Sequence, residues 1–303
     1  MDALIARLRQ HPQYYILLSL ISASFLSLSW YFPFTPLAFL GLAPLLEMES
    51  QIAEKKPKYP TLQFFLYGWL TLCLWNVGVI WWLWNAAGWA TLGAWIANSL
   101  LQVLPLVAFQ IIKRTSANRF GYFAFVVCWV TFEWVHLQWD LSWVWLNLGN
   151  VFANTPSWVQ WYSFTGSFGG TIWILLANVV AFKWVFQRKL TVYAWVLLVL
   201  FPIIPSAISY WNYEATGEEI EVVVVQPNLD CYTEKFTYNA KTGEQKQATH
   251  VPYQQQIKRL LDLSSQSITP ATKYVLFPET ALHNGENVAE ASNYFDVNEV
   301  SKW

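Results

Sequence analysis

Apolar residues fill long stretches of the first two thirds of the chain. Between residues 61 and 112 no side chain is charged, which leaves room for two membrane-crossing helices of about 20 residues each and a turn. The second predicted span is short and contains Pro36 and Pro44, which interrupt helices. The hydropathy pattern predicts about seven spans, over residues 14–31, 34–48, 61–84, 89–112, 120–137, 166–186 and 190–211.

Charged residues divide the chain into two parts. Residues 1–213 hold 11 basic and 6 acidic side chains, and residues 214–303 hold 7 basic and 13 acidic ones. The sequence therefore predicts a helical transmembrane domain over 1–213 and a soluble domain over 214–303. Charged residues make up 12% of the chain and aromatic residues 18%, which argues against a disordered chain and against an ordinary soluble enzyme. The net charge of −1 gives no basic field for nucleic acid, and no cysteine spacing points to a metal.

The basic residues of the first part all fall on one side of the predicted spans. By the positive-inside rule this side is the cytoplasm, and an odd number of spans then places the second domain outside. In a bacterium the predicted location is the plasma (inner) membrane, with a cytoplasmic N-terminus and a periplasmic C-terminal domain. The residues concerned are Arg7, Arg9, Lys55, Lys56, Lys58, Lys113, Arg114, Arg119, Lys183, Arg188 and Lys189.

Polar side chains inside the predicted spans are candidates for function or for packing. Glu133 lies in the fifth span, where a carboxylate faces a partner or a water-filled cavity, or is bonded to its neighbours as a structural group. The sequence leaves both alternatives open. His136, Asn76, Asn85 and Asn98 fit hydrogen bonds between helices better than catalysis.

Segment 138–165 is rich in tryptophan and carries no lysine or arginine. It is either an aromatic belt at the outer membrane interface or a re-entrant, lid-like piece that meets a lipid substrate. The composition favours the belt.

The soluble part shows a strand, a helix and a second strand. Residues 219–225 and 274–278 are predicted buried strands, and 251–268 carry a helical apolar stripe. The two strands should be parallel neighbours, and ligands bind beyond the carboxyl ends of such strands. Glu279 and the Gln226-Pro227-Asn228 turn fall there. Glu279 can serve as a general base beside a nucleophile, but a solvated strand-end acid would look the same.

These motifs resemble the start of a nitrilase-type domain, and with the aromatic spans the chain resembles apolipoprotein N-acyltransferases. The matching residues include segment 34–44, the Trp129…Glu133-Trp134 motif and segment 143–150, which contains Trp145. The Gln-Pro-Asn turn, Lys235-Phe236 and the Pro-Glu279-Thr motif complete the resemblance. It implies a polytopic α-helical membrane domain followed by the beginning of a truncated αββα nitrilase-like sandwich.

The resemblance also implies a reaction. A fatty acyl group passes from a membrane phospholipid to the N-terminal diacylglyceryl-cysteine amine of an apolipoprotein, through a thioester and a Glu-Lys-Cys triad. Glu279 matches the general base. Lys235, Phe236, Glu133 and Trp145 match substrate-contact positions, although Phe236 stands where the family usually has Trp and lacks its indole N–H. No metal or cofactor is implied, and a monomer is expected.

One departure from the family concerns the triad. The family's catalytic Lys and Cys follow the Pro-Glu motif at a distance, whereas this chain ends 24 residues after Glu279. Cys73 and Cys128 lie in predicted spans, Cys231 follows the first strand, and Lys273 precedes the second. None suits the missing role, so we expect an N-terminal fragment without activity of its own.

Other functions remain open on the sequence. They are a non-enzymatic membrane protein with an outer partner-binding module, a transporter lined by Glu133 and the asparagines, and a membrane-bound amidase or nitrilase. A lipid thioester on the complete enzyme would separate the transferase from the amidase.

The sequence predicts that this chain alone does not acylate a lipoprotein. In vesicles that hold a phospholipid donor and a diacylglyceryl-cysteine peptide, mass spectrometry should detect no N-acylated peptide. A family member that carries all three triad residues, tested in the same vesicles, is the positive control. N-acylated peptide formed by this chain alone would contradict the prediction.

Overall fold

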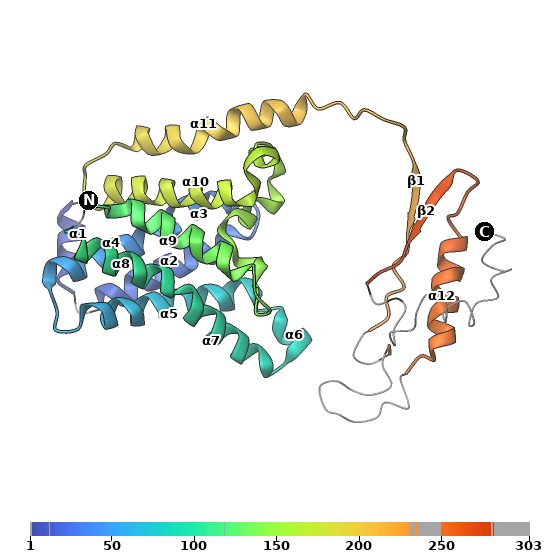
Figure 1. The fold of residues 1–303 in the computed structure, drawn as a ribbon, viewed down its shortest axis with the longest axis horizontal. Coiled ribbons are helices and arrows are strands. Elements are labelled where there is room, and N and C mark those ends of the chain that lie inside the picture. The colour runs from blue at the N-terminus through green and yellow to red at the C-terminus, as the bar shows by residue number, and fades with distance from the viewer. Residues whose placement is uncertain are drawn as a thin grey trace. The chain divides into compact units, whose positions relative to one another are not determined.

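A computed structural model of the protein describes residues 2–11, 13–117, 119–230, 234–235, 250–279 and 281. The chain forms two compact units, Met1–Glu214 and Ala215–Trp303, and each is described by itself. The first is helical and the second contains the only two strands among the described residues (Figure 1).

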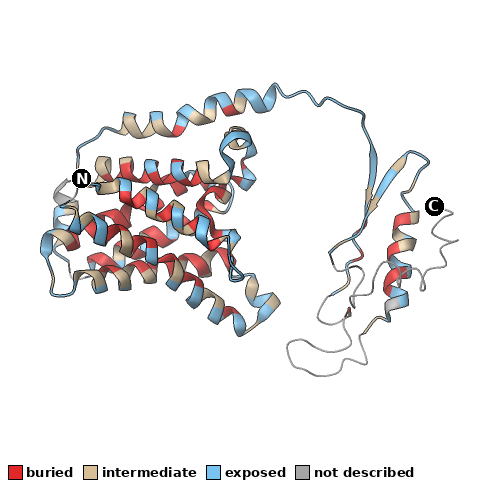
Figure 2. Cartoon of the chain, in the orientation of Figure 1, coloured by how far each residue is buried: buried red, intermediate tan, exposed pale blue. Residues whose placement is uncertain are grey.

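The helical unit is built around a core of large apolar side chains. Trp75, Trp129 and Phe39 are almost fully buried, and the buried residues gather where the helices face one another (Figure 2). The longer helices are α2 (Tyr14–Ser29), α4 (Ala43–Lys55), α5 (Pro60–Ile80), α7 (Ala90–Gln102), α8 (Leu104–Thr115), α9 (Gly121–His136), α10 (Tyr162–Val185) and α11 (Val192–Trp211). The shorter elements are α1 (Asp2–Arg9), η1 (Thr35–Leu37), α3 (Ala38–Gly41) and α6 (Leu83–Ala87).

Four helical stretches among the described residues are long and apolar enough to cross a membrane. They are α5, the pair α7 and α8 taken as Ala90–Thr115, α10 and α11, while the apolar helix α2 is shorter. The helical membrane character predicted from the sequence is thus supported. The count of seven spans stays a prediction.

The second predicted span, 34–48, is not one helix. The chain there forms η1, α3 and α4 in succession, with Pro36 in η1 and Pro44 in the first turn of α4. Proline is favoured in the first turn of a helix and removes a backbone hydrogen bond in its interior, so the two prolines favour a break in this segment. The prediction of a single span is therefore wrong here, and α4 continues to Lys55.

Asn178 of α10 occupies the break between α3 and α4. Its side-chain oxygen accepts hydrogen bonds from the backbone N–H groups of Leu42 at 2.7 Å and Ala43 at 3.0 Å. Its amide nitrogen donates to the carbonyls of Ala38 at 2.8 Å and Ile174 at 2.9 Å. The side chain is fully buried, so one amide replaces the partners that the interrupted helix has lost.

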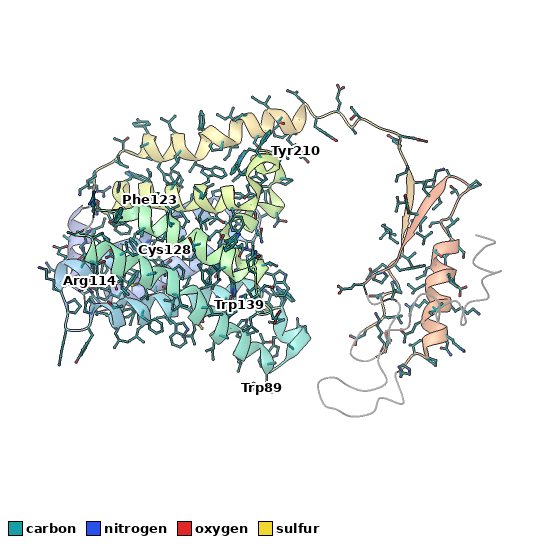
Figure 3. All side chains as sticks on the ribbon, viewed as in Figure 1. Trp89, Arg114, Phe123, Cys128, Trp139 and Tyr210 are labelled. Atoms are coloured by element: carbon teal, nitrogen blue, oxygen red, sulfur yellow. The ribbon has the colours of Figure 1, made fainter. Side chains whose placement is uncertain are left out.

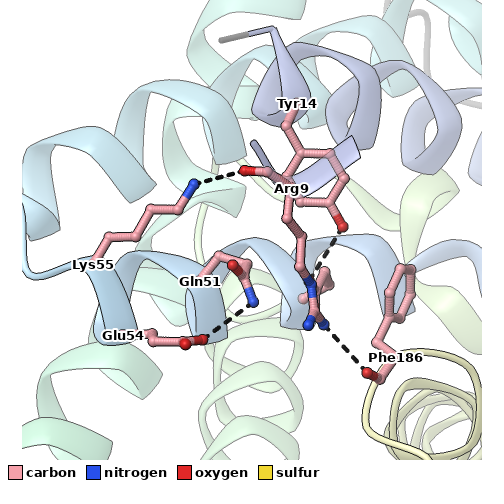
Figure 4. Close-up of polar contacts among 7 residues, drawn as sticks. Arg9, Tyr14, Gln51, Glu54, Lys55 and Phe186 are labelled. Carbon is pink, nitrogen blue, oxygen red and sulfur yellow. Dashed lines mark hydrogen bonds and ion pairs between the residues drawn. The ribbon is translucent and has the colours of Figure 1, made fainter. Parts of the chain in front are cut away.

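Ion pairs join the ends of several helices at the end of the unit where α4 finishes. Buried Glu47 of α4 accepts hydrogen bonds from Arg9 Nε at 2.8 Å and Tyr14 Oη at 3.1 Å (Figure 4). Arg9 also donates to the carbonyl of Phe186, just after α10, at 3.2 Å. Lys113 of α8 pairs with Glu49, two residues along α4. Two basic residues therefore compensate two buried acids.

The second unit confirms the predicted parallel pairing. Strand β1 (Glu221–Val224) pairs in parallel with β2 (Thr272–Leu276), and α12 (Tyr253–Ser265) lies between them in the chain. The expectation that the strands are buried is wrong for the described chain, because Val224 is 74% and Leu276 50% exposed. One helix covers only one face of a sheet, so the other face stays open.

Asn178→Leu should lower the free energy of unfolding by about 3 kcal/mol, because it removes the side-chain oxygen that accepts from two buried backbone N–H groups. Thermal unfolding in detergent, followed by near-ultraviolet circular dichroism of the tryptophans, measures the change. Asn212→Leu is the matched control, since Asn212 is exposed after α11. Equal stability of the two variants would contradict this role of Asn178.

Candidate functional site

A pocket of about 180 Å³ lies at the carboxyl ends of β1 and β2. The turn 226–228 forms one side, and Pro278 and Glu279 follow β2 on another. Lys235 and Gln256 also line it. The structure therefore brings Glu279 and the turn together as the strand order predicted. The catalytic role of Glu279 stays a prediction.

Two hydrogen bonds hold the backbone of Lys235 in place. It is 8% exposed, its N–H donates to the carbonyl of Asp230 at 3.0 Å, and its own carbonyl accepts from Gln256 Nε2 at 3.0 Å. Gln256 also donates to the carbonyl of Val251 at 2.7 Å. The sequence analysis missed Gln256, whose signal was an amide beside Ile257 in the apolar stripe of α12.

The chemistry of this pocket is that of an exposed carboxylate near a buried lysine. Glu279 can accept a proton from a group that enters the pocket, and Lys235 brings positive charge to the same space. Two predicted residues, Phe236 and Cys231, lie outside the described residues. No cysteine lies among the described residues of this unit.

Glu133 lies in the last turn of α9 and is 3% exposed. One carboxylate oxygen accepts from Trp129 Nε1 at 3.0 Å and from the backbone N–H of Leu148 at 2.8 Å. The other accepts from the hydroxyl of Thr171, on α10, at 2.7 Å. All three donors belong to the protein, so the geometry favours the structural alternative for Glu133 over direct substrate binding.

The Trp-rich segment 138–165 enters the helical unit through three short 3-10 helices, η2 (Val144–Leu146), η3 (Leu148–Asn154) and η4 (Pro156–Trp158). Phe152 is buried and stacks on Trp173 with ring centroids 5.1 Å apart. An aromatic belt alone does not describe such a segment, because η3 is packed inside the bundle.

Gly149 allows η3 to approach α10. Its N–H donates to Thr171 Oγ1 at 3.0 Å, and its carbonyl accepts from Tyr162 Oη at 2.8 Å. A Cβ at this position would collide with the backbone carbonyl of Ser167. The close contact therefore requires glycine, and it seats η3 beside Glu133 through their shared partner Thr171.

Trp145, predicted to contact substrate, lies in η2 at 47% exposure. Its ring meets Trp143 edge-on at 4.8 Å and Trp82, after α5, at 5.8 Å. Trp89 and Trp139 lie at this end of the helical unit, and Arg114 lies at the other (Figure 3). Exposed tryptophans thus gather at the end opposite to the basic residues.

A chain of hydrogen bonds confirms the prediction that His136, Asn98 and Asn76 link helices. Trp139 Nε1 lies 3.0 Å from His136 Nδ1, and His136 Nε2 lies 3.2 Å from Asn98 Oδ1. Asn98 donates to Asn76 at 2.7 Å, and Asn76 donates to Gln102 at 2.7 Å. These bonds join α9, α7 and α5.

Neither the two described cysteines nor the described acidic residues form a second site. Cys73 and Cys128 are free and partly exposed on α5 and α9, away from Glu279 in the chain. Among the described residues, no group of three or more His, Cys, Asp or Glu side chains is placed to hold a metal.

Comparison with known proteins gives two matches. A family model described as the apolipoprotein N-acyltransferase N-terminal domain matches residues 22–180, just over half of the chain. A curated protein named apolipoprotein N-acyltransferase, from Chlorobaculum tepidum, is 26% identical to this chain over 270 residues. The alignment covers 86% of this chain and 47% of that relative, so the chain spans about half the relative's length. No solved structure matches.

Glu133→Ala should lower the free energy of unfolding by about 3 kcal/mol. The substitution removes the carboxylate that accepts hydrogen bonds from the backbone N–H of Leu148 and from the side chains of Trp129 and Thr171. Glu133→Gln keeps one acceptor oxygen and should cost about 1 kcal/mol. Thermal unfolding in detergent checks both values, with exposed Glu54→Ala as the control. A Glu133→Ala variant as stable as this control would contradict the structural role.

Proposed function

Because this chain belongs to the apolipoprotein N-acyltransferase N-terminal domain family, we propose that it takes part in the N-acylation of lipoproteins. In the proposed reaction a fatty acyl group leaves a membrane phospholipid and is joined to the N-terminal diacylglyceryl-cysteine amine of an apolipoprotein. The phospholipid is the donor and the apolipoprotein the acceptor, and the enzyme acts as a monomer.

One observation supports the proposal: Glu279 and Lys235 line the same pocket. In the first half-reaction the Glu279 carboxylate accepts the proton of a cysteine thiol, and the thiolate attacks the ester carbonyl of the phospholipid. The ester C–O bond breaks, the lysophospholipid oxygen takes up a proton, and a thioester forms. In the second, the lipoprotein amine attacks the thioester, the thiolate leaves, and Glu279 accepts a proton from the amine.

The cysteine and the lysine of the proposed triad correspond to family positions that follow the Pro-Glu motif. This lysine is a different residue from Lys235. Lys235 is proposed to contact the substrate, since its positive charge lies in the same pocket as Glu279. An ammonium there can pair with a phosphate or carbonyl oxygen of the donor. The backbone contacts of Lys235 with Asp230 and Gln256 would hold it in place.

The helical unit is proposed to bring the reaction to the outer face of a bacterial inner membrane. Exposed tryptophans at one end suit a membrane interface, and basic residues at the other suit the cytoplasmic side. An odd number of membrane crossings with a cytoplasmic N-terminus would then place the Glu279 domain in the periplasm. Trp145, at the tryptophan end, would meet the lipid donor there.

Glu279→Gln should reduce acyl transfer roughly a hundredfold to ten-thousandfold, because the amide cannot accept the proton. The assay uses membranes of cells that make the enzyme with all three residues of the proposed triad, a phospholipid with an alkyne-labelled acyl chain, and a diacylglyceryl-cysteine peptide. Glu218→Gln, which makes the same chemical change at an exposed site before β1, should keep full activity.

A second readout separates the transferase from an amidase. The protein should carry the labelled acyl chain in a form that hydroxylamine releases, as a thioester does, and Glu279→Gln should abolish this label. Label on the protein but never on the peptide would reject lipoprotein acylation. A Glu279→Gln variant with normal transfer would reject Glu279 as the base.

A further inference from the structure

A second cavity, of about 1100 Å³, opens on the helical unit between α9 and α10. Its two regions differ in chemistry. One end is lined by cations from the last turns of α8 and α10 and from the loops beside α9 and α10, and the remainder runs along apolar side chains of α9 and α10. The cations are Lys113, Arg119, Lys183 and Lys189, and the apolar residues include Val126, Val127, Val130, Ile172, Leu176 and Val179.

The cations at this end outnumber their acidic partners. Lys113 is paired with Glu49, but Arg119, Lys183 and Lys189 form no ion pair within the described part of the chain. The ammonium groups of Lys113 and Lys183 lie over the same ring, that of Tyr122, at 4.8 and 5.7 Å from its centroid. Glu49 already neutralises Lys113, so Lys183 adds a positive charge at this ring that no acid among the described residues neutralises.

The apolar region continues from the cationic end along the helices. Ile172 and Leu176 of α10 are 39% and 42% exposed, and Val127 of α9 is 43% exposed. Phe123, 69% exposed, stands on α9 near the same end (Figure 3). A ligand that fits both regions needs an anionic group joined directly to a long apolar chain.

We propose that this cavity is a binding site for an anionic phospholipid, separate from the acyl-transfer pocket. The phosphate lies among Arg119, Lys183 and Lys189, and an acyl chain lies along Val130, Ile172 and Leu176. The charge complementarity selects an anionic lipid over a zwitterionic one. Glu133 and the tryptophans lie at the opposite end of α9, so this lipid is not the acyl donor.

The charge of the cavity is tested by replacing its three unpaired cations. Native mass spectrometry of the full chain in detergent, with added dioleoyl phosphatidylglycerol or dioleoyl phosphatidylcholine, measures lipid binding. The wild type should prefer the former. The triple variant Arg119→Gln, Lys183→Gln, Lys189→Gln should bind phosphatidylglycerol roughly a hundredfold more weakly, since each cation contributes about fivefold.

A matched control removes the same charge elsewhere. Arg7→Gln, Lys56→Gln, Lys58→Gln changes three exposed cations that do not line the cavity, and its binding should stay within a few fold of wild type. Equal losses in the two triple variants would overturn the proposal. So would inorganic phosphate displacing the lipid completely, because the site would then recognise a free anion rather than a lipid.

The apolar region is tested without changing charge. Leu176→Trp fills it and should weaken phosphatidylglycerol binding, whereas Leu197→Trp, on exposed α11 outside the cavity, should not. Thermal unfolding of both variants in lipid-free detergent shows whether each is folded. A folded Leu176→Trp variant that binds phosphatidylglycerol as tightly as wild type would also overturn the proposal.

Discussion

Backbone that leaves helical geometry inside an apolar unit must find its hydrogen-bond partners within the protein. Two buried side chains meet this constraint. Asn178 completes the break between α3 and α4, and Glu133 holds the N–H of Leu148 at the start of η3. In lipid each of these backbone groups would otherwise go unpaired at a cost of several kcal/mol, so the irregular segments depend on these two side chains.

The hydrogen bonds of both irregular segments involve residues of α10, so this helix organises the unit. Asn178 contacts the α3–α4 segment from one position on α10, and Thr171, two turns earlier, contacts Glu133 and Gly149. The early broken segment and the Trp-rich segment are far apart in sequence but are positioned by one helix. Trp145 and its ring neighbour Trp143 directly precede η3, at the end of the unit that suits a membrane interface.

Periodicity and charge were enough to predict the helical unit, the parallel strands and the position of Glu279 beside turn 226–228. They failed where the outcome depends on a distant partner. Glu133 had two possible roles until Leu148 and Thr171 were seen to donate to it. The strand residues looked buried because apolar composition does not tell which surface covers them, and Gln256 looked like an ordinary helix residue.

Five of the basic residues that the positive-inside rule counts as one group fall into two classes in the structure. Arg9 and Lys113 are committed to the buried carboxylates Glu47 and Glu49, and they hold the ends of α1, α4 and α8 together. Arg119, Lys183 and Lys189 have no such acid within the described part of the chain and face a cavity instead. A cation already neutralised by a buried acid adds little to the field at the membrane surface. The attraction for anionic lipid therefore comes from the second group, which is the group beside the apolar cavity.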